Sequence, residues 1–394
     1  MTGTGQELRP GRARLARALR DSGVIPAAWS PAFEAIDRAW FLPTVMWPFD
    51  MATATSVTCD RDTDPDTWFA YADANVPVTT QWDDGRHTGP APGRVPTSSA
   101  SMPSVVMAML DDLDIHPGHR VLEVGTGTGW NAALLTHRLG PDHVTTVEVD
   151  PTVAATAENT LRAHGLHPTV ITGDGLLGHP PAAPYDRIIA TAGLRRVPYA
   201  WVEQTVPGGV IVAPWGTRLT NADHVVRLVV ADDGKSASGR FTTPVEFMKI
   251  RSQRPERLDQ AAYLPDGFPG DATTTVTTLT SHDVGFEDPI RHPFMTAAGV
   301  LVGDCVLLSD RRAGAVSVWL YALSDRSWAA GVFHDATPRT TVYQSGSRRL
   351  WDEIESAHRW WTHTGSPTCD RFGLTIDPQG EHAWLDVPTN RLDA

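Results

Sequence analysis

Between residues 121 and 213 the chain alternates short apolar runs with segments whose apolar residues recur at helical spacing. Five of these runs are typical of buried strands, and they cover residues 121–124, 144–150, 169–172, 185–190 and the second half of 201–213. Such an alternation predicts a mostly parallel sheet, which binds its ligands at the carboxyl ends of the strands.

The first of these runs leads into a glycine-rich turn. The sequence Glu-x-Gly-x-Gly-x-Gly spans residues 123–129 and comprises Glu123, Gly125, Thr126, Gly127, Thr128 and Gly129. Glycines let the backbone turn tightly and approach a ligand closely. Glu148, followed by Val149, lies near the end of the next run, where a Rossmann-type sheet places an acid that binds ribose hydroxyls. The pattern predicts a nucleoside cofactor.

The spacing of the glycines favours one kind of cofactor. A dinucleotide fingerprint reads Gly-x-Gly-x-x-Gly, whereas here the third glycine comes one residue earlier, and Glu123 would repel a pyrophosphate. The turn resembles the first motif of S-adenosylmethionine-dependent methyltransferases, which implies S-adenosyl-L-methionine as cofactor. Asp174 and Gly175 follow the third run, where an acid can meet the adenine amino group. The alternative is a glycine-rich turn without a ligand.

Several further segments resemble one family of methyltransferases. Residues 39–43, 173–175, 183–188 and 206–214 are similar, in this order, to motifs of protein-L-isoaspartate O-methyltransferases. The resemblance covers roughly residues 30–250. It implies an α/β fold, a Rossmann-like class I methyltransferase with a mostly parallel central sheet, and methylation of a carboxylate.

The chain departs from this family at the substrate motif. The repair enzymes carry Thr-Ile-Ser-Ala-Pro-His-Met, but residues 97–103 read Thr-Ser-Ser-Ala-Ser-Met-Pro. Ser99 falls on the family's active-site serine, and Ser98 and Ser101 flank it as further candidates. The loss of the Pro-His pair argues against ordinary isoaspartyl repair. An alternative is that one of these serines only caps the following helix.

The serine-rich motif follows Val78-Thr-Thr-Gln81 and an insertion rich in Gly and Pro. This arrangement resembles methyltransferases of ribosomal-peptide gene clusters, which accompany ATP-grasp ligases (graspetides) or lanthipeptide synthetases and methylate an aspartate that closes to an aspartimide. The tail at residues 370–380 and 384–386 is more similar to the ATP-grasp group. The implied partner is a ribosomal precursor peptide already macrocyclised by an ATP-grasp ligase, with Thr80, Gln81 and Arg195 as substrate contacts.

Other functions remain open from the sequence. They are a lanthipeptide-associated methyltransferase, an isoaspartyl repair enzyme, a small-molecule methyltransferase and a non-catalytic peptide-binding module. The insertion at residues 82–97 is expected to be either a lid or binding loop, or a disordered segment.

The length of 394 residues suggests more than one domain. We expect an N-terminal helical, substrate-side segment at residues 1–80 and a cofactor-binding core at 81–251. A smaller C-terminal α+β domain at 271–394 could bind peptide through its tryptophans, although core packing is the commoner role of such residues.

A net charge of −13 argues against nucleic acid or an anionic membrane as the main partner. An acidic substrate then needs a local positive patch, for which Arg187, Arg195, Arg196 and Arg218 are candidates, unless they are simply paired or solvated. The three cysteines lack metal-ligand spacing, and no apolar run reaches the length of a membrane helix. The expectation is a cytoplasmic protein without a metal site, of undetermined oligomeric state.

Overall fold

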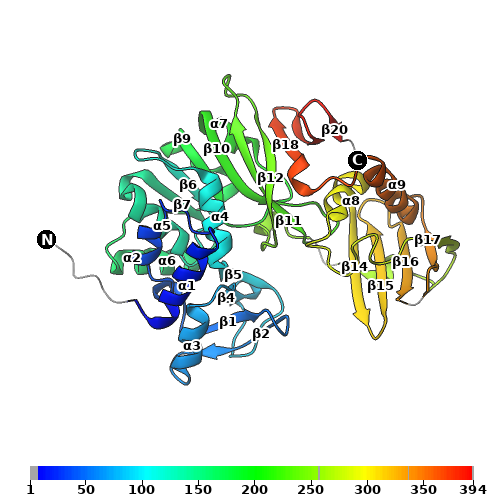
Figure 1. The fold of residues 1–394 in the computed structure, drawn as a ribbon, viewed down its shortest axis with the longest axis horizontal. Coiled ribbons are helices and arrows are strands. Elements are labelled where there is room, and N and C mark those ends of the chain that lie inside the picture. The colour runs from blue at the N-terminus through cyan, green and yellow to red at the C-terminus, as the bar shows by residue number, and fades with distance from the viewer. Residues whose placement is uncertain (1–7, 256–257, 336, 393–394) are drawn as a thin grey trace. The chain divides into compact units, whose positions relative to one another are not determined.

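The computed structural model describes residues 8–255, 258–335 and 337–392, and it falls into two compact units (Figure 1). The first unit contains the described residues up to 191, with 200–212 and 232–234. The second contains residues 192–199 and 213–231 and the described residues from 235 onward. The units are therefore interleaved along the chain, whereas the sequence suggested consecutive domains.

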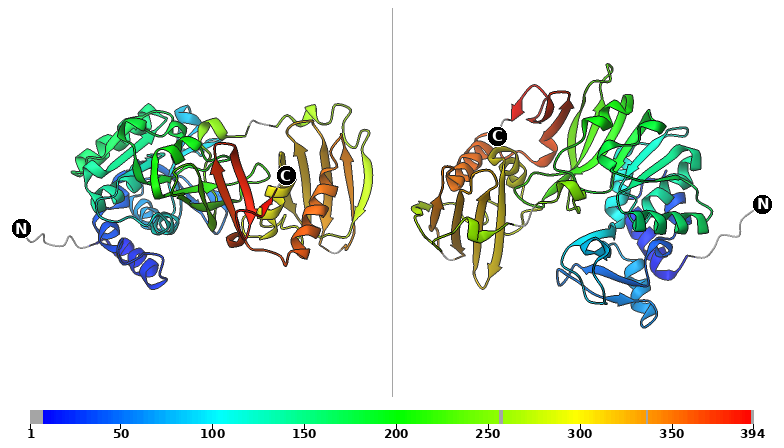
Figure 2. Two further views of the ribbon diagram at one scale, coloured as in Figure 1. Left: turned by 90° about the horizontal axis from the view of Figure 1, so that it is seen from above. Right: turned by 180° about the vertical axis from the view of Figure 1, so that it is seen from behind.

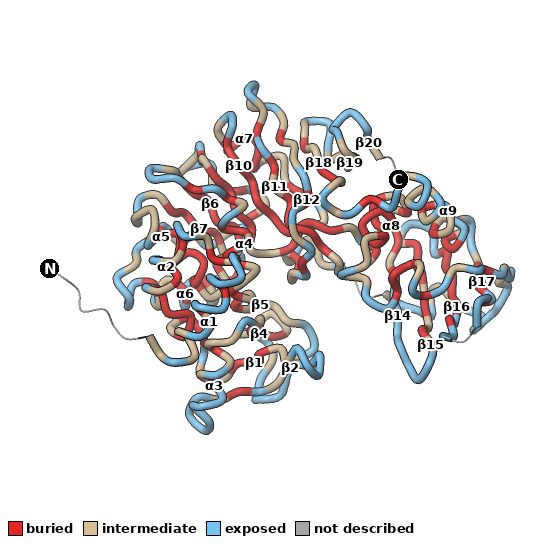
Figure 3. The backbone as a smooth tube through the Cα atoms, in the orientation of Figure 1, coloured by how far each residue is buried: buried red, intermediate tan, exposed pale blue. Residues whose placement is uncertain are grey.

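A parallel sheet with strand order β8-β7-β6-β9-β10 forms the centre of the first unit. Its strands are β6 (Val121–Val124), β7 (Val144–Glu148), β8 (Thr169–Thr172), β9 (Tyr185–Ala190) and β10 (Thr205–Trp215). The inner strand β6 is buried along its whole length (Figure 3), while the edge strand β8 is partly exposed. The chain reverses its direction across the sheet between β6 and β9, and such a switch point opens a crevice at the carboxyl ends of the strands. The predicted fold class is confirmed.

One helix precedes the first of these strands, and others connect β6 to β7, β7 to β8 and β9 to β10. They are α4 (Pro103–Leu113), α5 (Trp130–Leu139), α6 (Pro151–Ala163) and α7 (Tyr199–Glu203). Helix α6 begins at Pro151 because the carboxylate of Asp150 accepts hydrogen bonds from the amides of Thr152 and Val153, which lack a partner inside the helix. Gly129 precedes α5, and a Cβ there would lie only 3.3 Å from the Ala157 Cβ, so the glycine allows α5 and α6 to pack closely.

The N-terminal part of the first unit combines helices with a small antiparallel sheet of order β2-β1-β4-β5, in which β3 also pairs with β1. Its elements are α1 (Pro10–Asp21), α2 (Ser30–Ala35), the 3-10 turn η1 (Arg38–Phe41), β1 (Val45–Asp50), β2 (Thr55–Ser56), β3 (Cys59–Asp60), α3 (Pro65–Ala72), β4 (Val78–Trp82), the 3-10 turn η2 (Asp83–Gly85) and β5 (Pro96–Ala100). Helix α1 buries Ala16 and Leu19 and exposes most of its arginines.

Helix α2 is short. It ends at Ala35, because Ile36 is extended and Asp37 caps the next turn by accepting a hydrogen bond from the Ala39 amide. Asp37 also forms an ion pair with Arg9, which bonds Asp73 at the end of α3 as well. Arg9 thus connects the start of α1 with the residue before η1 and with the end of α3.

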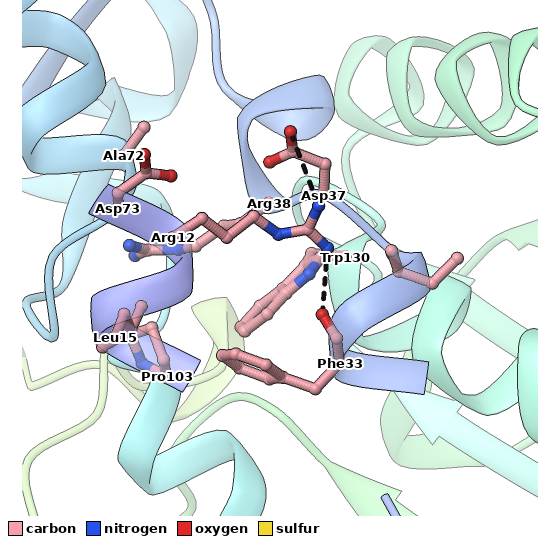
Figure 4. A pocket seen from close by; sticks show the side chains of 10 residues that line it. Arg12, Leu15, Phe33, Asp37, Arg38, Ala72, Asp73, Pro103 and Trp130 are labelled. Carbon is pink, nitrogen blue, oxygen red and sulfur yellow. Dashed lines mark hydrogen bonds and ion pairs between the residues drawn. The ribbon is translucent and has the colours of Figure 1, made fainter. Parts of the chain in front are cut away.

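Arg38 is 5% exposed and forms no ion pair with any residue that the structure describes. Its guanidinium donates hydrogen bonds to the backbone carbonyls of Ala74, Val76, Ala100 and Ser101, at 3.3, 2.9, 2.9 and 3.1 Å. It also lies over the Trp130 ring, 5.7 Å from the centroid. A cavity of about 10 Å³ lies against both residues (Figure 4). Burial lowers the pKa of the Arg38 guanidinium to about 9, so the side chain is charged at neutral pH.

The second unit contains two groups of antiparallel strands. One has the order β11-β12-β18-β19-β20 and the other the order β13-β17-β16-β15-β14. Their bounds are β11 (Asp223–Val230), β12 (Ala237–Val245), β13 (Thr273–Thr277), β14 (Cys305–Arg312), β15 (Ala315–Ala322), β16 (Trp328–His334), β17 (Thr340–Ser345), β18 (Phe372–Asp377), β19 (Gly380–Leu385) and β20 (Arg391–Leu392).

Helix α9 (Leu350–His363) packs on β15, β16 and β17, and α8 (Phe294–Val302) packs on α9 (Figure 2). Trp351 of α9 contacts Phe286 and Phe333, at ring-centroid distances of 6.0 and 5.3 Å. Trp328 and Trp384 are also buried in this unit. These three tryptophans form core, which leaves only the partly exposed tryptophans for the predicted contact with a peptide. No helix within the described ranges is both long and apolar enough to cross a bilayer.

We predict that Arg38→Met lowers the free energy of unfolding by about 3–5 kcal/mol, because it leaves one buried and three partly buried carbonyl oxygens without their donor. Differential scanning calorimetry measures this loss. Arg14→Met on the exposed face of α1 is the control and should change stability by less than about 0.5 kcal/mol. Equal melting temperatures for the two variants would show that Arg38 does not hold these segments.

Candidate functional site

The glycine turn between β6 and α5 has an unusual backbone. Gly125, Gly127 and Gly129 have φ values of 96°, 53° and 92°, a region that disfavours residues with a Cβ. The amides of Gly125 and Thr126 bond the Val147 carbonyl on β7, and the Thr191 hydroxyl after β9 bonds the Gly125 carbonyl. The turn is thus fixed by the strands on both sides of β6.

Glu148 lies directly beside this turn. One carboxylate oxygen accepts a hydrogen bond from the Gly127 amide at 2.9 Å, and the other accepts one from the Asp150 amide at 3.1 Å. Each oxygen of a carboxylate has two acceptor positions, so Glu148 can still accept hydrogen bonds from two hydroxyl groups. Val149 is 45% exposed next to it and offers an apolar surface.

Asp174 and Gly175 follow β8 as predicted. Asp174 is exposed, and its side chain caps the next turn by accepting from the Leu176 amide at 2.9 Å. Gly175 is buried, and a Cβ at this position would lie 2.3 Å from a Val124 methyl carbon. Only glycine therefore fits between this turn and β6.

Glu123 lies beneath the turn and is fully buried. Its carboxylate accepts hydrogen bonds from Asn131 Nδ2 at 2.7 Å and from Thr146 Oγ1 at 2.6 Å. Burial, together with the nearby charge of Glu148, raises the pKa of Glu123 to about 7, although its two hydrogen bonds act in the opposite direction. The side chain therefore joins α5 to β7 inside the protein and offers no surface to a ligand.

The substrate-side strands β4 and β5 pair with two irregularities. Thr79 pairs with Ser99, Gln81 with Ser98 and Trp82 with Pro96, which leaves Thr80 and Thr97 as the extra residues. Bulges of this kind redirect side chains and often occur beside active sites. Here the Thr80 hydroxyl donates to Ser98 Oγ at 3.3 Å, and the Thr97 hydroxyl donates to Gln81 Oε1 at 2.8 Å.

Strand β5 lies against the glycine turn. A Cβ built on Gly127 would be 3.6 Å from the Ser99 carbonyl oxygen and 4.0 Å from Ser98 Oγ. Gln81 Nε2 donates to the Asp150 carboxylate, two residues after Glu148, at 3.2 Å. The structure thus brings the predicted residues Ser98, Ser99, Thr80 and Gln81 to the predicted cofactor turn. Among the described residues, none forms a hydrogen bond with the half-buried Ser99 hydroxyl.

The expectation that one of the serines caps the next helix is wrong. Helix α4 begins at Pro103, and its N-cap is Met102, which makes no side-chain hydrogen bond. The Asn75 carboxamide oxygen instead accepts from the Ser104 amide at 2.9 Å. Ser101 contributes its carbonyl to the Arg38 cluster.

The candidate arginines are mostly engaged in bonds within the protein. Arg195, in the second unit, donates to the carbonyls of Thr217 and Thr220 and lies 3.8 Å from Asp223. Its role as a substrate contact stays a prediction. Arg187 is 7% exposed and donates to the carbonyls of Leu113 and Asp114, so it cannot belong to a surface patch.

Residues that the sequence analysis missed complete the site. Asn131 and Thr146 donate hydrogen bonds to Glu123, and Thr191 donates one to the glycine turn. The Asp150 carboxylate accepts a hydrogen bond from Gln81. Asp150 carried a recognisable signal, because an Asp directly before a Pro marks the start of a helix. The other three had no such signal.

The groups at this site fit an adenosyl cofactor. Glu148 at the end of β7 and Asp174 after β8 are acceptors for hydroxyl and amino groups. The glycines of the turn after β6 let its backbone approach a ligand closely. The Gly127 amide, which a dinucleotide-binding turn would offer to a pyrophosphate, donates to Glu148 instead. The geometry therefore favours a nucleoside without a diphosphate.

The pKa of Glu123 leads to a testable pH dependence. Folding raises this pKa from 4.5 to about 7, so the folded protein binds the additional proton in this window. The stabilisation is full below about pH 4.5 and is lost as the pH rises through about 7, by at most about 3 kcal/mol. Glu123→Gln should lack this dependence, whereas Glu158→Gln on α6 should retain it. Melting temperatures between about pH 5 and about pH 8 test this, and parallel curves for Glu123→Gln and the wild type would contradict it.

Comparisons with known proteins agree with this geometry. The family model described as Protein-L-isoaspartate(D-aspartate) O-methyltransferase (PCMT) matches residues 58–254. The Protein-L-isoaspartate O-methyltransferase of Methanopyrus kandleri is 43% identical over 152 residues, which are 38% of this chain and 60% of that protein. The enzyme of the same name from Ignicoccus hospitalis is 46% identical over 116 residues, 29% of this chain and 55% of that protein. The chain therefore spans little more than half the length of these relatives.

A solved structure of a protein-L-isoaspartate O-methyltransferase has a TM-score of 0.52 at 20% identity, and the match covers 95% of this chain and 100% of that chain. It shows the same fold. The cofactor of the site is S-adenosyl-L-methionine. Because the family model covers half of the chain, including β4, β5 and the whole parallel sheet, this protein belongs to the protein-L-isoaspartate(D-aspartate) O-methyltransferase family.

Proposed function

We propose that this protein esterifies the side-chain carboxylate of an aspartate in a ribosomally synthesised peptide that a partner enzyme, an ATP-grasp ligase, has already cyclised. The observation that carries this proposal is that the Ser98 hydroxyl and the Ser99 carbonyl lie beside Gly127, in a strand whose sequence departs from the family's substrate motif. Family membership supports methylation of a peptide carboxylate, and the altered motif supports a substrate other than isoaspartate.

The residues of the site divide the work between cofactor and substrate. When bound, S-adenosylmethionine supplies an electrophilic methyl group. Glu148 accepts hydrogen bonds from the ribose hydroxyls, and Asp174 accepts one from the adenine amino group. Ser99 donates its hydroxyl to one oxygen of the substrate carboxylate and so orients the other oxygen for reaction. A carboxylate is already ionised at neutral pH, so positioning suffices and no general base is needed.

The ester is suited to a second step within the substrate. The following backbone nitrogen attacks the ester carbonyl, loses its proton and expels methanol, which closes a five-membered aspartimide. A macrocycle that holds this nitrogen near the carbonyl favours the closure because less conformational freedom remains to be lost.

The insertion between β4 and β5 supports a dedicated substrate. The Asp83 carboxylate accepts hydrogen bonds from the amides of Arg94 and Val95 at 3.0 and 2.9 Å. The Pro90 carbonyl accepts from Trp47 Nε1 and from the Thr58 hydroxyl, both at 2.7 Å. The insertion is therefore an ordered loop that begins and ends at the two substrate-side strands, as a specificity loop would.

Isoaspartyl repair is the second candidate function. It is favoured by the similarity to relatives named protein-L-isoaspartate O-methyltransferase, which reaches 43% and 46% identity over the matched segments. The two candidates differ in their substrate, an aspartate in a cyclised peptide or an isoaspartate in an aged protein, so one assay separates them.

We predict that incubation of this protein with a cyclised precursor peptide and S-adenosylmethionine adds one methyl group to the peptide, followed by loss of methanol, as measured by the intact mass of the peptide.

Ser99→Ala should lower kcat by about 10-fold to 100-fold, because one orienting hydrogen bond to a charged group is lost. Ser309→Ala on the exposed part of β14 is the control. Methylation of isoaspartyl peptides alone would establish repair instead.

We also predict that Glu148→Ala weakens the binding of S-adenosylhomocysteine by about 10-fold to 100-fold, since hydrogen bonds to a charged acceptor are lost. Isothermal titration calorimetry measures this affinity, with the surface variant Glu158→Ala as control. An unchanged affinity in Glu148→Ala would place the ribose elsewhere and would favour a non-catalytic binding protein.

A further inference from the structure

We propose that Gln81 is a positioning residue that couples the cofactor site to the insertion at residues 83–95, so that binding of the cofactor orders the substrate loop. This inference deepens the proposed function and rests on it only because it treats the insertion as the surface that contacts the substrate. Its test requires S-adenosylhomocysteine, the product of the cofactor, and no peptide substrate.

The coupling begins at the cofactor turn. Gly127 and Asp150 donate their amides to the two oxygens of Glu148, and the Asp150 side chain accepts from the amides at the start of α6. Asp150 is 7% exposed, and its second carboxylate oxygen receives Nε2 of Gln81 at 3.2 Å. The side chain that caps α6 is therefore bonded both to the ribose-binding region and to β4.

The coupling continues from Gln81 into the insertion. Gln81 Oε1 accepts from the Thr97 hydroxyl at 2.8 Å, and Thr97 Oγ1 in turn accepts from the Asp84 amide at 3.1 Å. Gly85, with a φ of 77°, lies against the Gln81 amide, and a Cβ there would be 3.2 Å from Nε2. The first residues of the insertion are thus held by groups that touch Gln81.

Glutamine is suited to this position because its amide donates from one end and accepts at the other. A carboxylate accepts only, so it could bond Thr97 but would be repelled by Asp150. The two bulges place Thr80 and Thr97 as the extra residues on either side of the Gln81–Ser98 pair. The irregular pairing therefore serves to direct Gln81 toward Asp150 and Thr97 toward Gln81.

A ribose that binds Glu148 must share its oxygens with the amides of Gly127 and Asp150. Any resulting shift or tightening of Asp150 reaches Gln81 directly and the insertion through Thr97. Coupling of this kind is reciprocal, so weakening the contact from the loop side must also weaken binding of the cofactor. The backbone ladder between β4 and β5 and the burial of Trp82 do not use the Gln81 side chain, so we expect the fold to survive its replacement.

Hydrogen exchange with S-adenosylhomocysteine as the probe tests the coupling. In the wild type, we expect the nucleoside to slow exchange of the amides in residues 84–97. In Gln81→Ala and in Thr97→Val, this protection should be lost, and the dissociation constant measured by calorimetry should rise by about 5-fold or more, the lower range of measured allosteric couplings. Gln379→Ala, in an exposed turn of the second unit, is the matched control and should behave as the wild type.

Gln81→Glu provides a readout that a purely structural role would not change. The new carboxylate faces Asp150 and is repelled by it, so the variant's affinity for S-adenosylhomocysteine should be lower than that of the wild type at about pH 8. As the pH falls toward about 5, the ratio of the two affinities should approach one, because a protonated carboxyl group can donate to Asp150. Wild-type affinity and undiminished protection of residues 84–97 in Gln81→Ala would overturn the proposal. So would a constant ratio of Gln81→Glu to wild-type affinity across this pH range. Failure of the wild type to methylate a precursor would refute the proposed function without affecting these measurements.

Discussion

A buried cation that forms no ion pair within the described ranges determines how β5 is placed beside the glycine turn. Arg38 uses its guanidinium to hold the carbonyls that end β5, at Ala100 and Ser101, and it packs on Trp130, the first residue of α5. Because α5 begins directly after the glycine turn, this one side chain fixes the substrate strand beside the segment that binds the cofactor. Arginine suits the task because it presents several donors in one plane and stays charged when buried.

The cofactor half of the site could be predicted from the sequence because its signals are local. The apolar runs that became β6, β7, β8 and β9 are short. Helices separate the first three of them, short 3-10 turns separate β8 from β9, and the glycines lie within one turn. Glu148 and Asp174 were found because Glu148 ends one strand and Asp174 lies two residues beyond the end of the next. The position of a residue at the end of a parallel strand is enough to place its side chain at the ligand edge of the sheet.

The residues of the substrate half could be identified from the sequence, but their arrangement in space could not be predicted. Serine at 99 was recognised by its motif, yet its position over Gly127 depends on a bulged pairing and on Arg38, sixty residues away in the chain. The prediction that a serine caps α4 was wrong for the same reason, because the partner is distant in the sequence. Asn75 accepts the hydrogen bond from the Ser104 amide, and no local sequence pattern indicates a partner so far away. Glu123 was expected at the ligand because its spacing fits, but spacing does not report whether a side chain faces the cavity or the core.

This difference explains why family membership and substrate identity are separate questions for this chain. The parallel sheet and the glycine turn, which we expect to bind the cofactor, depend on backbone geometry that any member of the fold must keep. In the proposed function, the carboxylate substrate meets β4, β5 and the insertion between them, where two irregular pairings and an ordered loop replace regular structure. A change of substrate therefore requires changes only in this segment. The altered serine motif and the insertion both lie there, while the cofactor turn matches the family pattern.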